Sequence, residues 1–278
     1  MRRLAALATA LLAAATAYVA LLYHAAELDL RGERLFGANT AAVRVYIEPI
    51  AINAVSDSIQ ARVSIVSGAA AGEIPSSDPD HDFSLLLGHD DVIERIEVHA
   101  HRPAPVTTID LDLHDGDVSA YPLDSYRVKL WLRAVGAPGS QTDTPPSVTV
   151  WERVLGFRLQ TSERPQAAPG ERNLVFEIRR GAALTFFVLA AYVAMAVLGI
   201  GALTVGSLVF LGVRKPEATL MGALAGLVFA LPALRNALPG GAPLGVNADI
   251  FVFLWAELMA VSAIALLIFT WARSGPRP

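Results

Sequence analysis

One segment constrains the fold of this chain more than any other, because residues 181–213 contain no charged side chain. An α-helix rises about 1.5 Å per residue, so a helix of these 33 residues would be about 50 Å long. The hydrocarbon core of a bilayer is only about 30 Å thick. The segment, which ends at Arg214 and Lys215, therefore predicts a membrane helix that tilts or extends beyond the lipid.

Three further apolar segments have about the length of a membrane helix: residues 4–23, 218–234 and 250–271. With 54% hydrophobic and only 17% charged residues, the chain is too apolar for one soluble domain. The expected fold class is mixed, with four transmembrane α-helices, one N-terminal and three C-terminal, and a domain inserted after the first. The predicted domains are residues 1–26, 27–180 and 181–278.

The N-terminal apolar segment fits both a signal peptide and an uncleaved anchor, since Arg2 and Arg3 precede it. Cleavage after Ala17 would leave the apolar residues 18–23 at the start of the mature chain. The segment is also too long for a typical signal core. An anchor within residues 1–26 is therefore favoured, and a cleaved signal peptide is the alternative.

Short basic flanks predict the orientation of the chain in the membrane. They are Arg2 and Arg3, Arg214 and Lys215, and Arg273 and Arg277. Because basic residues favour the cytoplasmic side, both termini are expected in the cytoplasm and residues 27–180 outside the plasma membrane. Arg179, Arg180 and Arg235 then fall on the outer side, against the rule. The reverse orientation places all the flanking bases outside and fits less well.

Residues 27–180 have the period of β-strands, with apolar side chains at every second position. The alternating sets are Val43, Val45 and Ile47; Val63 and Ile65; Ile96, Val98 and Ala100; Ile109, Leu111 and Leu113; and Val128, Leu130 and Leu132. Segments rich in turn-forming residues separate them, at 72–82, 115–116, 136–147 and 164–170. About eight short strands are expected, the last near 173–178, and they form an all-β antiparallel sandwich.

The composition of this inserted domain excludes several classes of function. Residues 27–180 hold 23 acidic and 15 basic side chains, a net charge of −8 that disfavours nucleic acid as a partner. The chain has no cysteine, so it has no disulfide, thiolate metal site or cysteine nucleophile. Gly-x-Ser-x-Gly, His-Glu-x-x-His and the phosphate-binding glycine loop are also absent. We therefore expect neither an enzyme nor a bound cofactor.

The acidic segment from Asp110 to Asp117 suggests a calcium loop at first sight. In that loop the sixth residue is Gly and the twelfth is Glu, whereas here these positions hold Asp115 and Tyr121. Strand alternation followed by a hairpin turn at Asp115-Gly116 explains the pattern without a metal.

His99 and His101 form the second metal-like pattern. They are two residues apart on a predicted strand, so both side chains would face one side and could share a metal. Two histidines do not complete a site, and an exposed polar strand face is the simpler interpretation. No metal is expected, and these histidines stay as weak candidates.

Three ionisable residues lie in or beside the predicted membrane helices: Arg235, Asp249 and Glu257. Glu257 follows Asp249 by eight residues, about 12 Å along a helix, where a charge must be paired, protonated or hydrated. The functional interpretation is an ion or proton relay, or a ligand counter-ion. The structural one, which we favour, is a buried pair between Arg235 and one acid that joins the last two helices. Glu257 is the expected partner, and Asp249 competes with it.

Small residues in two predicted helices indicate close helix packing. They occur as Gly199-x-Gly201 and as Gly222-Ala-Leu-Ala-Gly226. Such faces also make an oligomer possible. The other expected partners are the lipid bilayer and another membrane or envelope protein.

Three stretches together resemble a known family: Tyr121-Pro122-Leu123-Asp124-Ser125-Tyr126, residues 235–245, and Asp249 with Trp255-Ala256-Glu257. They are similar to the membrane-protein family called domain of unknown function 4436, which is common in actinobacteria. The likeness extends over nearly the whole chain, in the order one helix, ectodomain and three helices. A ratio of 20 arginines to 2 lysines agrees with a high-GC bacterial genome. The family has no assigned activity, so the resemblance implies no functional residue.

The Tyr-Pro-Leu-Asp element also resembles the Phe-Pro-x-Asp turn in the β-sandwich of pentameric ligand-gated channels. That family has four helices after its sandwich, whereas three are predicted here. The paired cysteines of its eukaryotic members are missing, and no predicted helix has a polar pore-lining stripe.

The turn itself is expected to be structural. Proline fixes φ, and Asp124 can accept hydrogen bonds from nearby backbone amides. The residues expected to form it are Tyr121, Pro122, Asp124 and Tyr126. The leading hypothesis for the whole chain is a non-enzymatic envelope protein whose sandwich binds or positions a partner. A channel-like or ligand-sensing receptor is the alternative.

Overall fold

The computed structural model describes residues 17, 18, 20, 21, 32–38, 41, 43–67, 79, 81–136, 145–152, 154–241 and 243–273. The anchor predicted within residues 1–26 and the loop predicted at 72–82 lie largely outside these residues. The chain forms two compact units. One holds the strands, with residues up to Asp117 and Asp124–Ala183, and the other holds the helices, with Val118–Leu123 and the chain from Leu184 onward.

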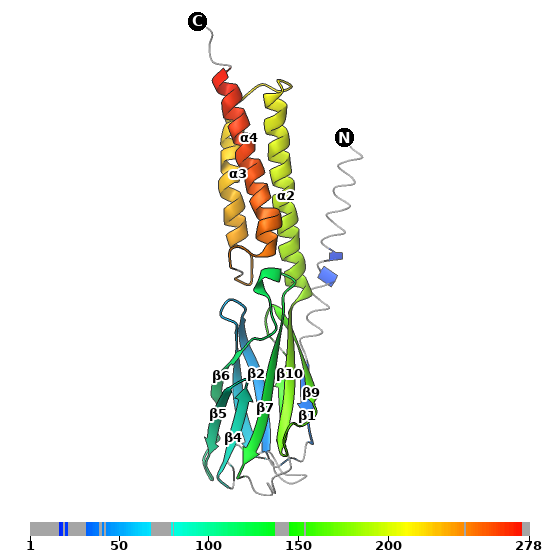
Figure 1. The fold of residues 1–278 in the computed structure, drawn as a ribbon, viewed down its shortest axis with the longest axis vertical. Helices are drawn as coiled ribbons and strands as arrows, with labels where there is room; N and C mark the ends of the chain where they lie inside the picture. Colours follow the sequence, from blue (N-terminus) through cyan, green and yellow to red (C-terminus); the bar gives the residue numbers. More distant parts are fainter. Residues whose placement is uncertain are drawn as a thin grey trace. The chain divides into compact units, whose positions relative to one another are not determined.

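The first unit contains two five-stranded sheets in a β-sandwich-like arrangement (Figure 1). In sheet order, one consists of β1 (Glu33–Phe36), β8 (Ser147–Trp151), β2 (Val43–Asn53), β3 (Ser58–Ser67) and β6 (Thr107–Asp112). The other consists of β5 (Val92–Val98), β4 (Phe83–His89), β7 (Ser125–Val135), β10 (Glu171–Arg180) and β9 (Phe157–Arg164). Neighbouring strands are antiparallel except β2 and β8, which run parallel. The described residues thus confirm a sandwich-like fold, but the parallel pair of β2 and β8 departs from the antiparallel arrangement that the sequence predicted.

The core of this unit lies on the inward faces of the strands. Val45, Ile47 and Val63 are 0% exposed, as the period of two predicts. The alternating residues of β6 and β7 are buried in the same way. β4 differs, because six of its seven residues are buried, and its sequence alternates less clearly as a result.

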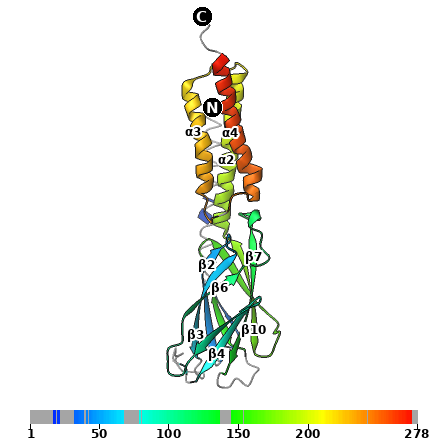
Figure 2. The ribbon, with the colours of Figure 1, turned by 60° about the vertical axis from the view of Figure 1, so that its left-hand side comes forward.

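The second unit contains three helical segments that are long and apolar enough to cross a membrane, counted over the residues that the structure describes. They are α2 (Ala182–Phe210), α3 (Ala218–Asn236) and a segment from Asp249 to Arg273. The last segment combines the π-helical turn η2 (Asp249–Phe253) with α4 (Leu254–Arg273). The three helices run side by side, as Figure 2 shows. Their positions match the three C-terminal spans predicted from the sequence.

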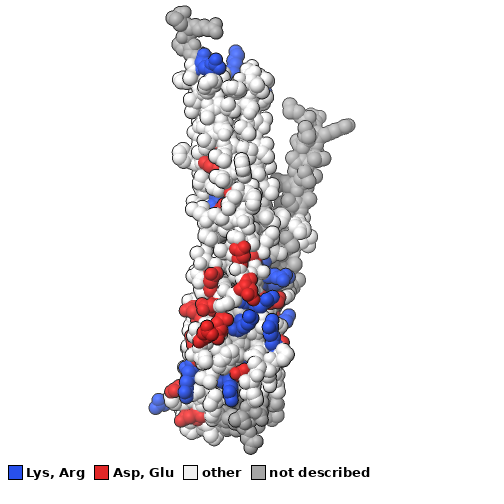
Figure 3. All heavy atoms as spheres, viewed as in Figure 1, with Lys and Arg blue, Asp and Glu red and all other residues white. Residues whose placement is uncertain are grey.

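Charged residues are distributed differently in the two units (Figure 3). They are frequent over the strands, whereas the visible face of the helical unit is largely uncharged. Basic residues occur where α2 and α4 end, and they include Arg214, Lys215 and Arg273. The ring centroids of Phe210 and Phe269 are 6.1 Å apart, so these two helix ends are neighbours.

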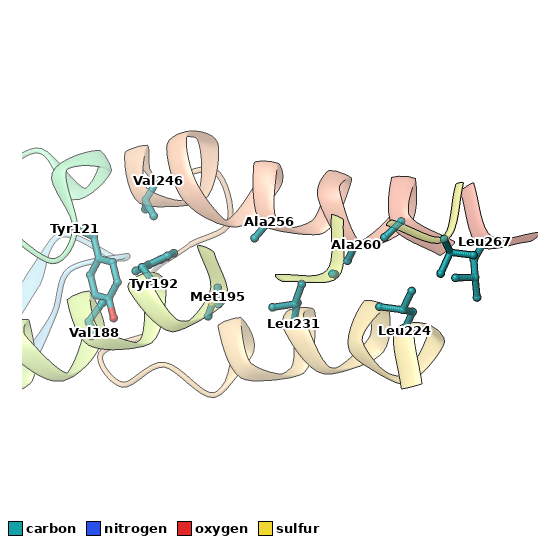
Figure 4. Packing of buried hydrophobic residues seen from close by; sticks show 13 residues of the cluster. Tyr121, Val188, Tyr192, Met195, Leu224, Leu231, Val246, Ala256, Ala260 and Leu267 are labelled. Atoms are coloured by element: carbon teal, nitrogen blue, oxygen red, sulfur yellow. The ribbon is translucent and has the colours of Figure 1, made fainter. Parts of the chain in front are cut away.

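Small residues bring α2 and α4 together. The buried residues of α2 recur at alternating intervals of four and three, as in a coiled coil: Val188, Tyr192, Met195, Gly199, Ala202, Gly206 and Val209. A Cβ atom on Gly199 or Gly206 would lie 2.8 Å from the Cα of Ala256 or Ala263, respectively. Figure 4 shows Ala256 and Ala260 of α4 in the bundle interior. Only glycine therefore allows this approach of the two backbones.

The remaining glycines of the predicted packing motifs have no helix of the described residues against them. A Cβ atom on Gly201, Gly222 or Gly226 would meet no described atom within 4 Å. Gly201 follows Gly199 by about 200° around the helix, so it faces away from α4. The opposite side of α3, which carries Leu224 and Leu231, packs against the other helices. Among the described residues, the packing prediction is confirmed for Gly199, and no helix packs against Gly222 and Gly226.

The connection from β6 to β7 is not the hairpin predicted at Asp115-Gly116. β6 pairs with β3, whereas β7 pairs with β4 and β10, so the chain changes sheets here. A two-residue turn joins strands that pair with each other, and it cannot make this crossing. The connection instead contains the 3-10 turn η1 (Val118–Ala120) and a cis peptide bond between Tyr121 and Pro122.

Candidate functional site: the β6–β7 turn and two buried arginines

The β6–β7 turn, Val118–Leu123, belongs to the helical unit although the residues on both sides of it belong to the sandwich. The Tyr121 hydroxyl donates to the carbonyl of Pro239, in the α3–α4 connection, at 2.7 Å. The Thr185 hydroxyl of α2 donates to the carbonyl of Pro122 at 3.3 Å. These bonds attach the turn to two separate parts of the helical unit.

Apolar packing adds to these bonds. Tyr121 is 2% exposed and belongs to the buried cluster of the helices. Figure 4 shows its ring beside Val188 and near Tyr192, at the end of the cluster where Val246 also lies. Burial of an aromatic ring contributes roughly 1.5–3 kcal/mol, more than a single neutral hydrogen bond. Tyr121 is therefore the main anchor of the turn.

The sandwich holds the chain directly after the turn through Asp124, Tyr126 and Arg180, which we call the sandwich cluster. One carboxylate oxygen of Asp124 accepts from Nε of Arg180 at 2.5 Å, and the other accepts from the Tyr126 hydroxyl at 2.7 Å. The Arg180 guanidinium also lies 5.2 Å from the ring centroid of Phe157, at cation–π distance. The expected backbone-amide donors to Asp124 are thus replaced by two side chains.

Burial and electrostatics favour the neutral form of Tyr126. Burial of the ring, followed by the hydrogen bond to Asp124 and the negative charge of that carboxylate, raises the pKa of the Tyr126 phenol well above its usual value. Gly116 lies directly against this ring, and a Cβ there would clash with it. The Asp-Gly pair before the turn therefore gives Tyr126 room to reach Asp124.

A second buried arginine lies in the helical unit. Arg235 donates to Asp249 through Nε at 2.8 Å and through Nη2 at 2.5 Å, and Nη2 also donates to the Pro243 carbonyl at 2.7 Å. The Tyr192 hydroxyl donates to Asp249 at 2.8 Å, and the Gly245 amide does so at 3.0 Å. We call Tyr192, Arg235 and Asp249 the helix cluster. It joins α2, α3 and the start of the last helix.

Glu257 is not the partner of Arg235, which corrects the expectation from the sequence. Eight residues after Asp249, a helix has turned about 80° and risen about 12 Å, so Glu257 points along another direction at another depth. Its Oε2 atom is buried and has no hydrogen-bond partner among the residues that the structure describes. Asp249, the competing candidate, is the acid that the arginine binds.

The two histidines do not share a strand face. β5 ends at Val98, so His99 and His101 lie beyond it. His101 has a left-handed backbone with φ of 55°, and its amide donates to the Pro79 carbonyl at 2.8 Å. His99 instead faces Asp82, with Nδ1 and Oδ1 4.0 Å apart. Within the described residues, no three His, Cys, Asp or Glu side chains are grouped closely enough to hold a metal ion.

Sequence reasoning identified most of these residues but missed two of them. Arg180 was visible only as a base at the end of a strand, and Tyr192 as one aromatic residue in an apolar helix. The spacing of four and three in α2 places Tyr192 on the buried face, and this spacing could have identified Tyr192 from the sequence.

Two family models match the chain, and no curated protein does. One, Domain of unknown function (DUF8686), matches residues 180–274, which include the helix cluster and the stretches 235–245 and 249–257. The other matches residues 36–178, which include the β6–β7 turn but not the helices, so it covers less of the chain than the resemblance implied. Since that match spans 143 of the 278 residues, the chain belongs to the family described as Domain of unknown function (DUF4436).

Proposed function

We propose that this protein is a non-enzymatic membrane protein whose β-sandwich binds or positions a partner outside the membrane and whose β6–β7 turn relays that binding to the helices. The observation that carries the proposal is the attachment of the turn. Tyr121 is anchored to the helical unit at Pro239, and Asp124 is anchored to the sandwich at Arg180. Three residues of chain span at most about 11 Å, so a displacement of one anchor strains the other.

The orientation proposed for the chain places residues 27–180 outside the plasma membrane and both termini in the cytoplasm. The bases where α2 and α4 end support it through the positive-inside rule. Two of the three bases that oppose the rule, Arg180 and Arg235, are neutralised by Asp124 and Asp249. They therefore count little as free positive charge. An uncleaved anchor within residues 1–26 belongs to the same proposal.

Two features support a role without catalysis. Both carboxylate oxygens of Asp124 and of Asp249 accept hydrogen bonds, and an arginine neutralises each group. A carboxylate that is fully engaged in this way is a poor general base. The partner proposed is another membrane or envelope protein, and the open glycine face of α3 at Gly222 and Gly226 suits a helix of a partner or of a second copy.

A single-cysteine reporter tests the relay, because the chain has no cysteine of its own. Leu244, in the α3–α4 connection, is 74% exposed and is suitable for Leu244→Cys with an environment-sensitive fluorophore. The protein is purified from native membranes in mild detergent, and a stoichiometric co-purifying protein is removed and added back. We expect re-addition to change the fluorescence.

The variant Tyr121→Phe keeps the ring but removes the bond to Pro239. We expect it to bind the partner normally and to lose most of the fluorescence change. Tyr46→Phe, in β2, serves as the matched control and should behave like the parent. An equal response in parent and Tyr121→Phe would overturn the relay, and the lack of any partner for the folded sandwich would overturn the binding role.

A second candidate function is a channel-like, ligand-sensing receptor. The observation that favours it is the place where the Tyr-Pro-Leu-Asp turn attaches, which is the connection between the last two helices. Between their ends, the described helices expose mainly apolar side chains, among them Phe187, Val197 and Phe229, so this reading requires a pore formed by several copies. Native mass spectrometry and planar-bilayer recording test it. A symmetric pentamer that conducts ions supports the receptor, and a non-conducting monomer excludes it.

A further inference from the structure

A groove runs between α2 and α3 at the end of the helical unit where the two helices are joined. Its volume is about 750 Å³. Val209, Leu220 and Ala223 contribute to its apolar walls, whereas Arg214, Lys215 and Glu217 lie at its polar end. We call it the α2–α3 groove. Its apolar part is formed by membrane helices and its polar part by the link between them.

The polar end favours an anion. Arg214 and Lys215 are exposed, and with Glu217 they leave a net charge of +1 around the groove. The first turn of α3 starts here, and the Glu217 side chain makes no capping bond to it. Amide groups at the start of a helix carry partial positive charge and bind phosphate groups well.

The apolar walls distinguish a lipid from a soluble anion. A free phosphate would contact only the basic end and would leave the apolar walls of the groove uncovered. An acyl chain fills such a groove and removes apolar surface from the end of the bundle. Basic pockets between membrane helices on the cytoplasmic side suit anionic headgroups.

We propose that the α2–α3 groove binds an anionic glycerophospholipid of the cytoplasmic leaflet, with the phosphate at Arg214 and Lys215 and one acyl chain against Val209 and Ala223. The inference rests on the membrane orientation proposed above but not on the relay through the β6–β7 turn. Binding of this lipid joins the C-terminal end of α2 to the N-terminal end of α3.

Native mass spectrometry of the full chain in mild detergent tests the proposal, with phosphatidylglycerol as the probe and phosphatidylcholine as the neutral comparison. The parent should retain phosphatidylglycerol preferentially. The double variant Arg214→Gln/Lys215→Gln should lower its affinity about thirtyfold, because each of the two bases contributes about 1 kcal/mol to binding of an anionic headgroup. Glu217→Gln should raise the affinity severalfold.

Two controls separate the groove from general surface charge and from misfolding. Arg273→Gln removes a base at the same end, where the side chain lies over the ring of Phe269 and not in the groove, and it should change affinity less than twofold. Ala223→Phe fills the groove without changing charge and should also weaken phosphatidylglycerol binding. Only variants whose thermal unfolding matches the parent are compared.

Several outcomes would overturn the lipid assignment. Equal retention of the two lipids by the parent, or equal losses in Arg273→Gln and in the double variant, would do so. Competition by inorganic phosphate at millimolar concentration would assign the basic end to a soluble anion. If a cysteine at position 215 reacts with an impermeant maleimide from outside intact cells, the orientation itself fails. If that cysteine is protected from outside but the parent shows no preference for phosphatidylglycerol, the orientation stands and only the groove proposal is rejected.

Discussion

The two units of this protein bury the same set of groups in different surroundings. In each, an aspartate accepts hydrogen bonds from an arginine Nε and from a tyrosine hydroxyl. The members are Asp124, Arg180 and Tyr126 in the sandwich cluster, and Asp249, Arg235 and Tyr192 in the helix cluster. The sandwich unit resembles a soluble domain in its composition, whereas the helical unit is apolar on its outside.

The two clusters differ in the further contacts that their arginines and aspartates make. Arg235 adds a second bond to Asp249 and one to the Pro243 carbonyl, and the Gly245 amide also donates to Asp249. In the sandwich cluster, the Arg180 guanidinium lies against the ring of Phe157. Lipid offers no hydrogen bonds, so a charge between membrane helices must obtain them from the protein. Exposure does not separate the clusters, because the side chains of Arg180 and Asp124 are 1% and 0% exposed and those of Arg235 and Asp249 are 8% and 7% exposed.

The largest effect is expected when the helix cluster loses its charge balance. Asp249→Asn leaves Arg235 buried without a counter-ion, and removing one member of a buried pair costs about 3–5 kcal/mol. Arg235→Gln should do similar harm, and the double variant should recover part of the loss. Thermal unfolding in detergent measures these differences. Parent-like unfolding of both single variants would show that the pair contributes no net stability.

Loss of the charge balance in the sandwich cluster should also lower the free energy of unfolding, but by somewhat less. Asp124→Asn keeps one oxygen acceptor for Arg180, and the Phe157 ring still faces the guanidinium. We expect a loss of about 2–4 kcal/mol. Comparison of Asp124→Asn and Asp249→Asn by the same unfolding assay sharpens the contrast between the units. A larger loss in the sandwich would contradict this expected order.

Glycines mark a second difference between the units. In the helices, Gly199 and Gly206 face the backbone of α4, which cannot move aside, whereas Gly116 of the sandwich faces the side chain of Tyr126. Gly199→Ala and Gly206→Ala should each cost about 1–3 kcal/mol through overpacking. Gly201→Ala is the matched control in the same helix and should be neutral or slightly stabilising, since no described atom lies near its Cβ.

Alkaline pH should affect the sandwich cluster through Tyr126. The raised pKa of its phenol keeps the folded form neutral, whereas an unfolded tyrosine ionises near pH 10. The unfolded state therefore releases its proton first, and this contribution to stability is complete below about pH 10 and decreases above it. Between pH 9 and about 11, Tyr126→Phe should lose less stability than the parent. Parallel pH profiles would show that Tyr126 has no shifted pKa.

The sequence predicts the helices and strands where a local pattern of side chains determines them. The run of 33 residues without a charge predicted α2, because it is long and apolar enough to cross a membrane, and alternation predicted β2, β3, β6 and β7. The alternation did not predict β4, which is buried on both faces, or the parallel pairing of β2 with β8, which depends on distant chain segments. The β6–β7 turn was recognised from its residues, yet its attachment to Pro239 depends on a contact across 118 residues.

The choice between Asp249 and Glu257 as the partner of Arg235 shows the same limit of prediction from sequence. Depth in the membrane favoured Glu257, since a deep charge most needs a partner. Direction decides the matter instead, because Asp249 lies where the helix starts and where the Gly245 amide and the Pro243 carbonyl complete the network. A linear sequence gives depth but not the direction of a side chain relative to a second helix.

Glu257 should therefore give the smallest effect, and it offers the sharpest contrast with Asp249 in the same segment. Glu257→Gln removes a carboxylate whose Oε2 atom has no hydrogen-bond partner among the described residues. No ion pair with a described residue is broken and glutamine has nearly the size of the acid, so the change in unfolding free energy should be about 1 kcal/mol or less. A loss as large as that of Asp249→Asn would mean that Glu257 is paired with a cation outside the described residues. Dilution of the detergent-solubilised protein would then decide the source, because a pair with a second copy disappears as the oligomer dissociates, whereas a bound ion remains.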